Sequence, residues 1–251
     1  MNEDNVSIDQ MIGFLVTSHT KVDKLGEVAV VTVGTTREQA RESCIRSGCA
    51  LLTHGCFAWS GRVLMASVSR WGSKRMKLLN AVMRKEIDRL DDRSVRTKAV
   101  RIADIGNPAA WSRATWNTVK HGVRSRKLAM IGYIHGWQQP DAIKMRGDLM
   151  ASCETLNEVD FAVSQGWRAT VIMPWWHPRE VQTFTTTGGN EVKMCPAQLT
   201  KNLIQCNECQ WCDASGKSKR GKPYTFHVGF FDHSKKALAQ KRAAMRRGEI
   251  K

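Results

Sequence analysis

The chain has 251 residues, enough for one sizeable α/β domain with or without a small appendage. Hydrophobic residues make up 42% of it and nine are tryptophans, which excludes an intrinsically disordered chain. The acidic, polar start MNEDNVSIDQ lacks the basic segment of a secretory signal peptide, and no apolar run approaches the roughly 18–20 residues of a membrane helix. We therefore expect a soluble, cytoplasmic protein that uses no membrane.

The charge balance is strongly basic, with 39 Lys and Arg residues against 23 Asp and Glu, a net charge of +16. A surplus of this size predicts a polyanionic partner, most often nucleic acid. A basic surface without a specific partner is the competing interpretation. Residues 235–251 (KKALAQKRAAMRRGEIK) predict a basic helical tail, which could follow a phosphate backbone or be a frayed terminus.

The first hundred residues mix expected helices with one strand. Residues 1–16 predict a polar cap and short helix, and the Val-rich alternation of residues 24–34 predicts a strand. Residues 35–49 begin with a capping Thr and predict a helix that ends in a cysteine group. Apolar residues at three- and four-residue spacing predict a longer helix over residues 76–90.

From residue 99 the pattern alternates between strands and helices. Strands are expected at residues 99–106, 127–137, 148–154 and 168–174, with helices at 108–123 and 155–167. This alternation predicts an α/β fold with a parallel-stranded, barrel-like or partial-barrel domain over residues 1–178. Beyond Pro178 the periodicity ends, so we expect a small metal-binding module over 179–234, followed by the tail at 235–251.

Parallel sheets carry their chemistry at the carboxyl ends of the strands, and polar or aromatic residues follow all four strands expected after residue 98. The candidates for catalysis are Asp104, His135 and Glu154. The candidates for substrate binding are Arg101, Asn107, Tyr133, Trp137, Trp175 and Trp176. Each of these residues, taken singly, could instead be structural, and Cys153 at one strand end could be a reactive thiol or an ordinary buried one.

The late cysteines have the spacing of metal ligands. Cys206, Cys209 and Cys212 form a C-x2-C-x2-C run, and Cys195 could supply a fourth thiolate. With His227 or His233 instead, the set would make a Cys3His zinc site. The same run also holds [4Fe–4S] clusters in other proteins, so the spacing leaves Zn²⁺ and an iron–sulfur cluster both open.

A second group consists of Cys44, Cys49 and Cys56. Three thiolates with an open fourth position would suit a second cluster that also binds a substrate or cofactor. Two structural alternatives are buried cysteines in a Gly-rich turn and a site shared with His54.

An ordered series of motifs over residues 18–233 resembles a family of small, uncharacterised bacteriophage proteins. The segments that carry the resemblance are KLGEVAVVTVGTT, LLTHGCFAWSGRV, MIGYIHGW, LMASCETLNEVDFAVSQGWRATVIMP, CPAQLTKNLIQCNECQWC and FHVGFFDH. Through its Gly-Cys-Phe-Ala element the chain is distantly similar to phage proteins of the spore photoproduct lyase type, which are radical enzymes with iron–sulfur clusters. In expected architecture it also resembles guanine transglycosylases, which exchange a nucleobase on a barrel and carry a structural zinc.

The chain departs from both patterns. Its first cysteines are spaced C-x4-C-x6-C instead of the C-x3-C-x2-C of radical enzymes, which argues against a SAM-binding cluster. It has Ile-Gly-Asn-Pro where the phage family tends to have Ser-Gly-Asp-Phe, so Asn107 replaces an acidic residue and Asp104 becomes the candidate nucleophile.

Three hypotheses follow. The first is a phage-type enzyme that modifies bases in nucleic acid, DNA being favoured over RNA, by base exchange at Asp104 with a structural metal. The second is iron–sulfur or radical modification of nucleic acid. The third is a non-catalytic, metal-stabilised nucleic-acid-binding protein. If the chain is phage-encoded, the cytoplasm would be that of the infected host.

Overall fold

The computed structural model describes residues 12–15, 28–33, 37–49, 98–174, 176–217, 221–232 and 235–247. Within them the chain forms an α/β fold around one nine-stranded sheet. The strands are β1 (Ile12–Leu15), β2 (Ala29–Val33), β3 (Ala99–Ile102), β4 (Ala129–Ile134), β5 (Met150–Cys153), β6 (Ala169–Met173), β7 (Thr183–Thr185), β8 (Glu191–Met194) and β9 (His227–Phe231). The helices are α1 (Arg37–Arg46), α4 (Arg113–Arg124), α5 (Leu156–Ser164), α6 (Pro196–Leu199), α7 (Cys206–Cys209) and α8 (Lys235–Arg246), with 3-10 turns η6 (Pro108–Ala110) and η7 (Pro140–Met145).

The sheet is mostly parallel and its strands run in the order β1-β2-β3-β4-β5-β6-β9-β8-β7. Strands β2 to β6 are added one beside the next in chain order, all parallel, while β1 and β7 pair antiparallel with their neighbours at the two edges. Because parallel crossovers are right-handed, this order places successive crossovers on one face of the sheet. Within the described residues β1 and β7 end the order, so the structure shows an open sheet and no barrel closure.

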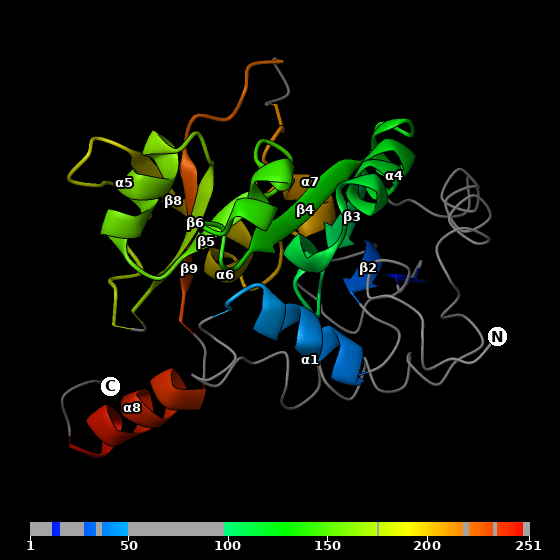
Figure 1. The fold of residues 1–251 in the computed structure, drawn as a ribbon. Helices are drawn as coiled ribbons and strands as arrows, with labels where there is room; N and C mark the ends of the chain where they lie inside the picture. Colours follow the sequence, from blue (N-terminus) through cyan, green and yellow to red (C-terminus); the bar gives the residue numbers. More distant parts are fainter. Residues whose placement is uncertain are drawn as a thin grey trace.

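Figure 1 shows α4 and α5 on one side of the sheet and α6 and α7 on the other. The α4–α5 side is an apolar core in which Trp116, Val119 and Val123 of α4 meet alternate residues of the strands. The spacing of these three residues puts them on one helical face, as expected of an amphipathic helix packed on a sheet. The opposite side holds a second cluster in which Cys195, Cys206 and Cys212 pack against the other residues of the same strands.

The helix termini follow the capping signals of the sequence. Ser112 precedes α4 and its hydroxyl accepts the N–H of Thr115, while Thr155 precedes α5 and accepts the N–H of Glu158. The carboxylate of Glu158 in turn accepts the N–H of Glu154, a reciprocal arrangement close to a capping box. The predicted strands and helices between residues 99 and 174 are confirmed at this level, as is a helix in the basic tail.

Two expectations differ from the structure. Residues 12–15 form strand β1 instead of part of a short helix, because they pair antiparallel with β2. The segment 179–234, expected as a separate small module, supplies β7, β8 and β9 to the common sheet, and β9 lies between β6 and β8. The helix expected at 76–90 lies outside the described residues. No described helix is long and apolar enough to cross a membrane.

Candidate functional site

Four cysteines from the C-terminal half of the chain line one small cavity. Cys195 directly follows β8, Cys206 and Cys209 begin and end α7, and Cys212 lies in the turn after it. Cys195, Cys206 and Cys212 are at least nine-tenths buried, and Cys209 is half-buried. The structure thus brings together the four thiols that the C-x2-C-x2-C run and Cys195 predict.

The backbone of this segment reverses direction within a few residues. One helical turn places Cys206 and Cys209 three residues apart on the same face. Gln210 then adopts a left-handed conformation with φ of 55°, and its N–H donates to the carbonyl of Cys206. Few side chains other than Gly, Asn and Asp favour this conformation. The turn brings Cys212 back toward the other thiols.

The cavity is small and its other walls are largely apolar. Its volume is about 10 Å³, and its walls include Ile131, Val228 and Phe230 from the sheet together with Trp211. A space of this size accommodates about one water-sized sphere.

Cys212 has an O–H donor and a cation close to it. The hydroxyl of Tyr133 donates to its Sγ at 3.4 Å. The guanidinium of Arg168 donates to the backbone carbonyls of Trp211 and Asp213 on either side of it. A nearby cation and an O–H donor both stabilise sulfur in its charged form, which is the form that binds metal.

The cysteine segment is fastened to the amino-terminal ends of the strands by buried polar contacts. Asp213 accepts two hydrogen bonds from the guanidinium of Arg124, at 2.8 and 2.9 Å, and one from the N–H of Met130 in β4. Asn207 accepts the N–H of Lys98, directly before β3. In α/β folds, contacts at this end of the strands serve stability more often than catalysis.

The other predicted metal ligands are placed differently. His227, in β9, is buried outside the cavity lining, and its Nδ1 accepts the N–H of Ala169 at 3.0 Å. Cys44 is buried in α1, and Cys49 follows that helix and donates its N–H to the carbonyl of Cys44. His233 and Cys56 lie outside the described residues. As the side chains stand, no group of three or more His, Cys, Asp or Glu within the described ranges could hold a metal ion.

At the carboxyl end of the sheet, Arg101, Tyr133 and His135 form a second candidate site. The guanidinium of Arg101, in β3, lies 4.3 Å from the ring centroid of Tyr133 in β4, a cation–π contact. Burial, with a smaller contribution from the charge of Arg101, lowers the pKa of His135 to about 4. His135 is therefore neutral at physiological pH and can accept a proton or a hydrogen bond there.

Asp104 follows β3 by two residues. The pairing of β3 with β4 ends at Ile102 and Gly132, so Asp104 lies beyond the paired part of the strand. Between strand and aspartate, Ala103 has a φ of +54°, which turns the chain out of the strand. Glu154 is exposed after β5, on the far side of β4 from Asp104.

The remaining strand-end candidates divide between core and surface. Asn107 is buried: its Nδ2 donates to the carbonyl of His135 and its Oδ1 accepts the N–H of Ala109, so it joins two loops. Trp137 is buried against Phe161 and Trp167. Trp176 is 66% exposed, and Trp175 lies outside the described residues. Cys153 is fully buried, and burial, with the charge of Glu158 second, raises its pKa to about 12, so it is no reactive thiol.

The residues that anchor the cysteine segment were not predicted from the sequence. Asp213 directly follows the last cysteine of the run, and Arg168 belongs to the Gly-Trp-Arg element that precedes β6. Both residues adjoin motifs that the sequence analysis identified, and this adjacency could have marked them as residues of the site. Arg124 has no such signal, because it is one of many basic residues in a basic chain.

Comparisons with protein-family models, with curated proteins and with solved structures found no match to this chain. The two sites above therefore stand on their own geometry.

Proposed function

We propose that this protein is a nucleic-acid-modifying enzyme, of phage type, that acts at the carboxyl edge of its sheet and holds one structural zinc ion among its late cysteines. The observation that carries the proposal is the cluster of Arg101, Tyr133 and His135 at the ends of two adjacent parallel strands. A cation on an aromatic ring beside a neutral imidazole offers charge, a stacking surface and a proton acceptor in one place.

The partner is proposed from charge. The net charge of +16 suits a polyanion, and α8 (Lys235–Arg246) carries no acidic residue. DNA is preferred to RNA because the motifs resemble phage proteins. An extruded base would stack near the strand ends, where Tyr133 and the exposed Trp176 are the aromatic candidates.

The proposed reaction is base exchange. The carboxylate of Asp104 would attack the anomeric carbon of the sugar, and the electron pair of the broken glycosidic bond would go to the departing base, which takes a proton from solvent. The incoming base would lose its N–H proton to His135 as its nitrogen attacks the same carbon. Bond formation there would release Asp104 as a carboxylate, and His135 would return its proton to water.

Zinc is proposed as a structural ion held by Cys195, Cys206, Cys209 and Cys212. The cavity has room for about one ion, and tetrahedral Zn–S bonds of about 2.3 Å would require the thiols to rotate toward its centre. Because the segment contacts the amino-terminal ends of β3 and β4, such an ion would hold the module to the sheet, and it would adjoin the candidate site only through the Tyr133 hydroxyl on Cys212.

The iron–sulfur alternative would place its cluster at Cys44, Cys49 and Cys56. Cys44 is buried and Cys49 half-buried at the end of α1, which lies against β2 and η6. Iron and acid-labile sulfide in anaerobically purified protein would favour this alternative over base exchange.

The proposal is tested by incorporation of a labelled free base into DNA and RNA, single- and double-stranded, alongside binding measured at 50 and 200 mM salt. Asp104→Asn and His135→Gln are expected to lower exchange by about 100-fold or more while binding is kept. Glu180→Gln, an exposed carboxylate on a loop, is the control and should exchange normally. Binding without any exchange would identify a non-catalytic nucleic-acid-binding protein, and normal exchange in Asp104→Asn would exclude Asp104 as the nucleophile.

A further inference from the structure

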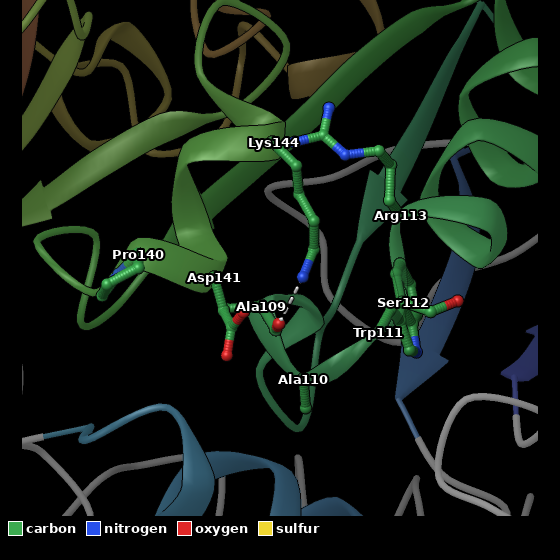
Figure 2. A pocket seen from close by; sticks show the side chains of 8 residues that line it. All are labelled: Ala109, Ala110, Trp111, Ser112, Arg113, Pro140, Asp141 and Lys144. Carbon is green, nitrogen blue, oxygen red and sulfur yellow. Dashed lines mark hydrogen bonds between the residues drawn. The ribbon is translucent and has the colours of Figure 1, made fainter.

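A polar pocket of about 300 Å³ lies between the loop that follows β3 and the loop that follows β4. It is thus on the same edge of the sheet as Arg101 and His135. Its lining residues, shown in Figure 2, are Ala109, Ala110, Trp111, Ser112, Arg113, Pro140, Asp141 and Lys144. A volume of this size is at the lower end of the range of small-molecule sites.

Two basic side chains reach into this pocket from different elements. Arg113 is the first residue of α4, and Lys144 belongs to η7. Figure 2 shows the Arg113 side chain extending toward the backbone of Lys144, while the Lys144 ammonium points away from that guanidinium to Ala109, and Asp141 lies on the far side of Ala109 from Arg113 in this view. The ammonium of Lys144 donates to the carbonyl of Ala109 at 2.9 Å, which fixes its charge at the pocket wall. Arg113 is exposed and can move onto a ligand.

The backbone at the start of α4 adds hydrogen-bond donors. The pocket includes the N-terminus of α4, a helix of twelve residues, where the first N–H groups and the helix dipole favour an anion. Trp111 lines the same pocket with 1% of its surface exposed. Its indole N–H has no hydrogen-bond partner among the described residues, although a buried donor is normally satisfied. That nitrogen has less than 1 Å² of accessible surface, so it does not face a ligand bound there.

Asn107 connects the pocket to the candidate catalytic residues. Its Oδ1 accepts the N–H of Ala109 at the pocket wall, and its Nδ2 donates to the carbonyl of His135. Asn107 is 2% exposed, so the two hydrogen bonds form a buried, rigid link. A group bound in the pocket would therefore have a fixed position relative to His135.

We infer that this pocket binds a phosphate group of the nucleotide chain next to the base that enters the candidate site. The inference rests on the proposed function for the identity of the ligand, a phosphodiester in a strand. The phosphate chemistry itself would also fit a free mononucleotide. Arg113 and Lys144 would supply the charge, the start of α4 the backbone donors, and Asn107 the register between phosphate and base.

The test compares Arg113→Gln with the matched control Lys127→Gln. Both residues are exposed and basic, and Lys127 lies just beyond the opposite end of α4. Binding of wild type and both variants is measured by calorimetry with inorganic phosphate, a mononucleotide and a short oligonucleotide, the last at several salt concentrations. Melting temperatures verify that the variants are folded.

The expected result is that Arg113→Gln weakens oligonucleotide binding about five- to tenfold and reduces the salt dependence of log K by about 0.7, the share of one contact to a single strand. Lys127→Gln should leave both unchanged. Arg113-dependent binding of a mononucleotide or inorganic phosphate without oligonucleotide binding would support the phosphate site and contradict the proposed function. Equal changes of oligonucleotide binding in Arg113→Gln and Lys127→Gln would overturn the inference and leave the proposed function standing. If the wild type binds none of the three ligands, the inference and the proposed function are both contradicted.

Discussion

The two ends of the parallel strands are built from different chemistry. At the amino-terminal end, Asp213, Asn207 and Arg168 each bond backbone groups, and three of the four thiols of the cysteine segment are buried. At the carboxyl end, Arg101 and a neutral His135 lie beside a left-handed alanine. Left-handed residues occur at both ends, Gln210 and Ala103, but the charges of the amino-terminal end are paired in the Arg124–Asp213 contact, and paired polar groups stabilise a fold. The difference suggests a division between stability and function along the strand direction.

The largest effect is expected from removal of the metal that we propose for the cysteine cavity. The protein as purified should contain about one zinc ion per chain, with no visible absorption, and chelation should cost several kcal/mol of stability because the module loses its central contact. Cys212→Ser should lower both the zinc content and the melting temperature. The measurements are elemental analysis, an absorption spectrum and thermal unfolding with and without chelator.

Cys49→Ser is the matched control, since Cys49 is half-buried outside the cavity. It should keep the zinc content of the wild type. A brown protein that loses its colour in Cys49→Ser would reverse the comparison, because a cluster at the N-terminal cysteines would then be the functional metal.

The second effect concerns the ion pair that fastens the cysteine segment to α4. Asp213 is 3% exposed, and Arg124 is partly buried. Asp213 accepts two hydrogen bonds from the Arg124 guanidinium and a third from the N–H of Met130. Asp213→Ala should destabilise the protein by about 3–5 kcal/mol, because it leaves a partly buried charge and a buried N–H unpaired. Glu42→Gln, which removes the exposed pair with Arg46 on α1, should cost less than about 0.5 kcal/mol. Urea unfolding measures both, and equal losses would refute the structural importance of the amino-terminal end.

The third effect is a loss of stability in acid that depends on His227. Burial, followed by the charge of Arg168, lowers the pKa of His227 from 6.5 to about 4, with Asp160 acting weakly in the opposite direction. A lowered pKa in the folded state means that the unfolded chain binds the proton more readily. The stability that the neutral His227 provides is therefore complete above pH 6.5 and is lost as the pH falls toward 4. The shift corresponds to about 3 kcal/mol at most.

His227→Asn tests this pH dependence, since the asparagine Oδ1 can still accept the N–H of Ala169. The variant should cost about 1 kcal/mol at pH 8 and show a shallower fall in unfolding free energy between pH 6.5 and 4 than the wild type. Parallel pH curves for the two proteins would contradict a neutral, buried His227.

The sequence was informative where local patterns decide the structure. Pro108 and the capping Thr155 located two helices, although α4 begins only at Arg113, after the 3-10 turn at Pro108–Ala110. The buried-type runs of apolar residues located β3 to β6. The four-thiol cavity also followed from spacing, because one helical turn and a reversal bring a C-x2-C-x2-C run together. Strands β7 and β8 were missed since they are short, three and four residues, although both alternate polar and apolar residues.

Long-range partners were beyond the sequence. The structural role of Asn107 depends on Ala109 and on a carbonyl from the next loop, and the insertion of β9 between β6 and β8 depends on pairing across more than fifty residues. Neither leaves a local pattern. The sequence located the strand ends, but it did not show which of their side chains are buried. Trp137 and Trp176 both follow expected strands, and Trp137 is buried while Trp176 is exposed.

The smallest effect sharpens the comparison at the carboxyl end. Ala103 has a φ of +54° between β3 and Asp104, a conformation that costs an L-residue about 1–2 kcal/mol and glycine almost nothing. Ala103→Gly should therefore raise the unfolding free energy by roughly 0.5 kcal/mol, after the greater chain entropy of glycine and the lost methyl contact are subtracted. Ala114→Gly, in the first turn of α4 with ordinary helical geometry, should instead lower it by up to about 1 kcal/mol.

If Ala103→Gly stabilises the protein and also slows base exchange, the strain holds Asp104 in place for the reaction. If it destabilises the protein as Ala114→Gly does, the carboxyl end stores no strain and the contrast between the two ends rests on charge alone.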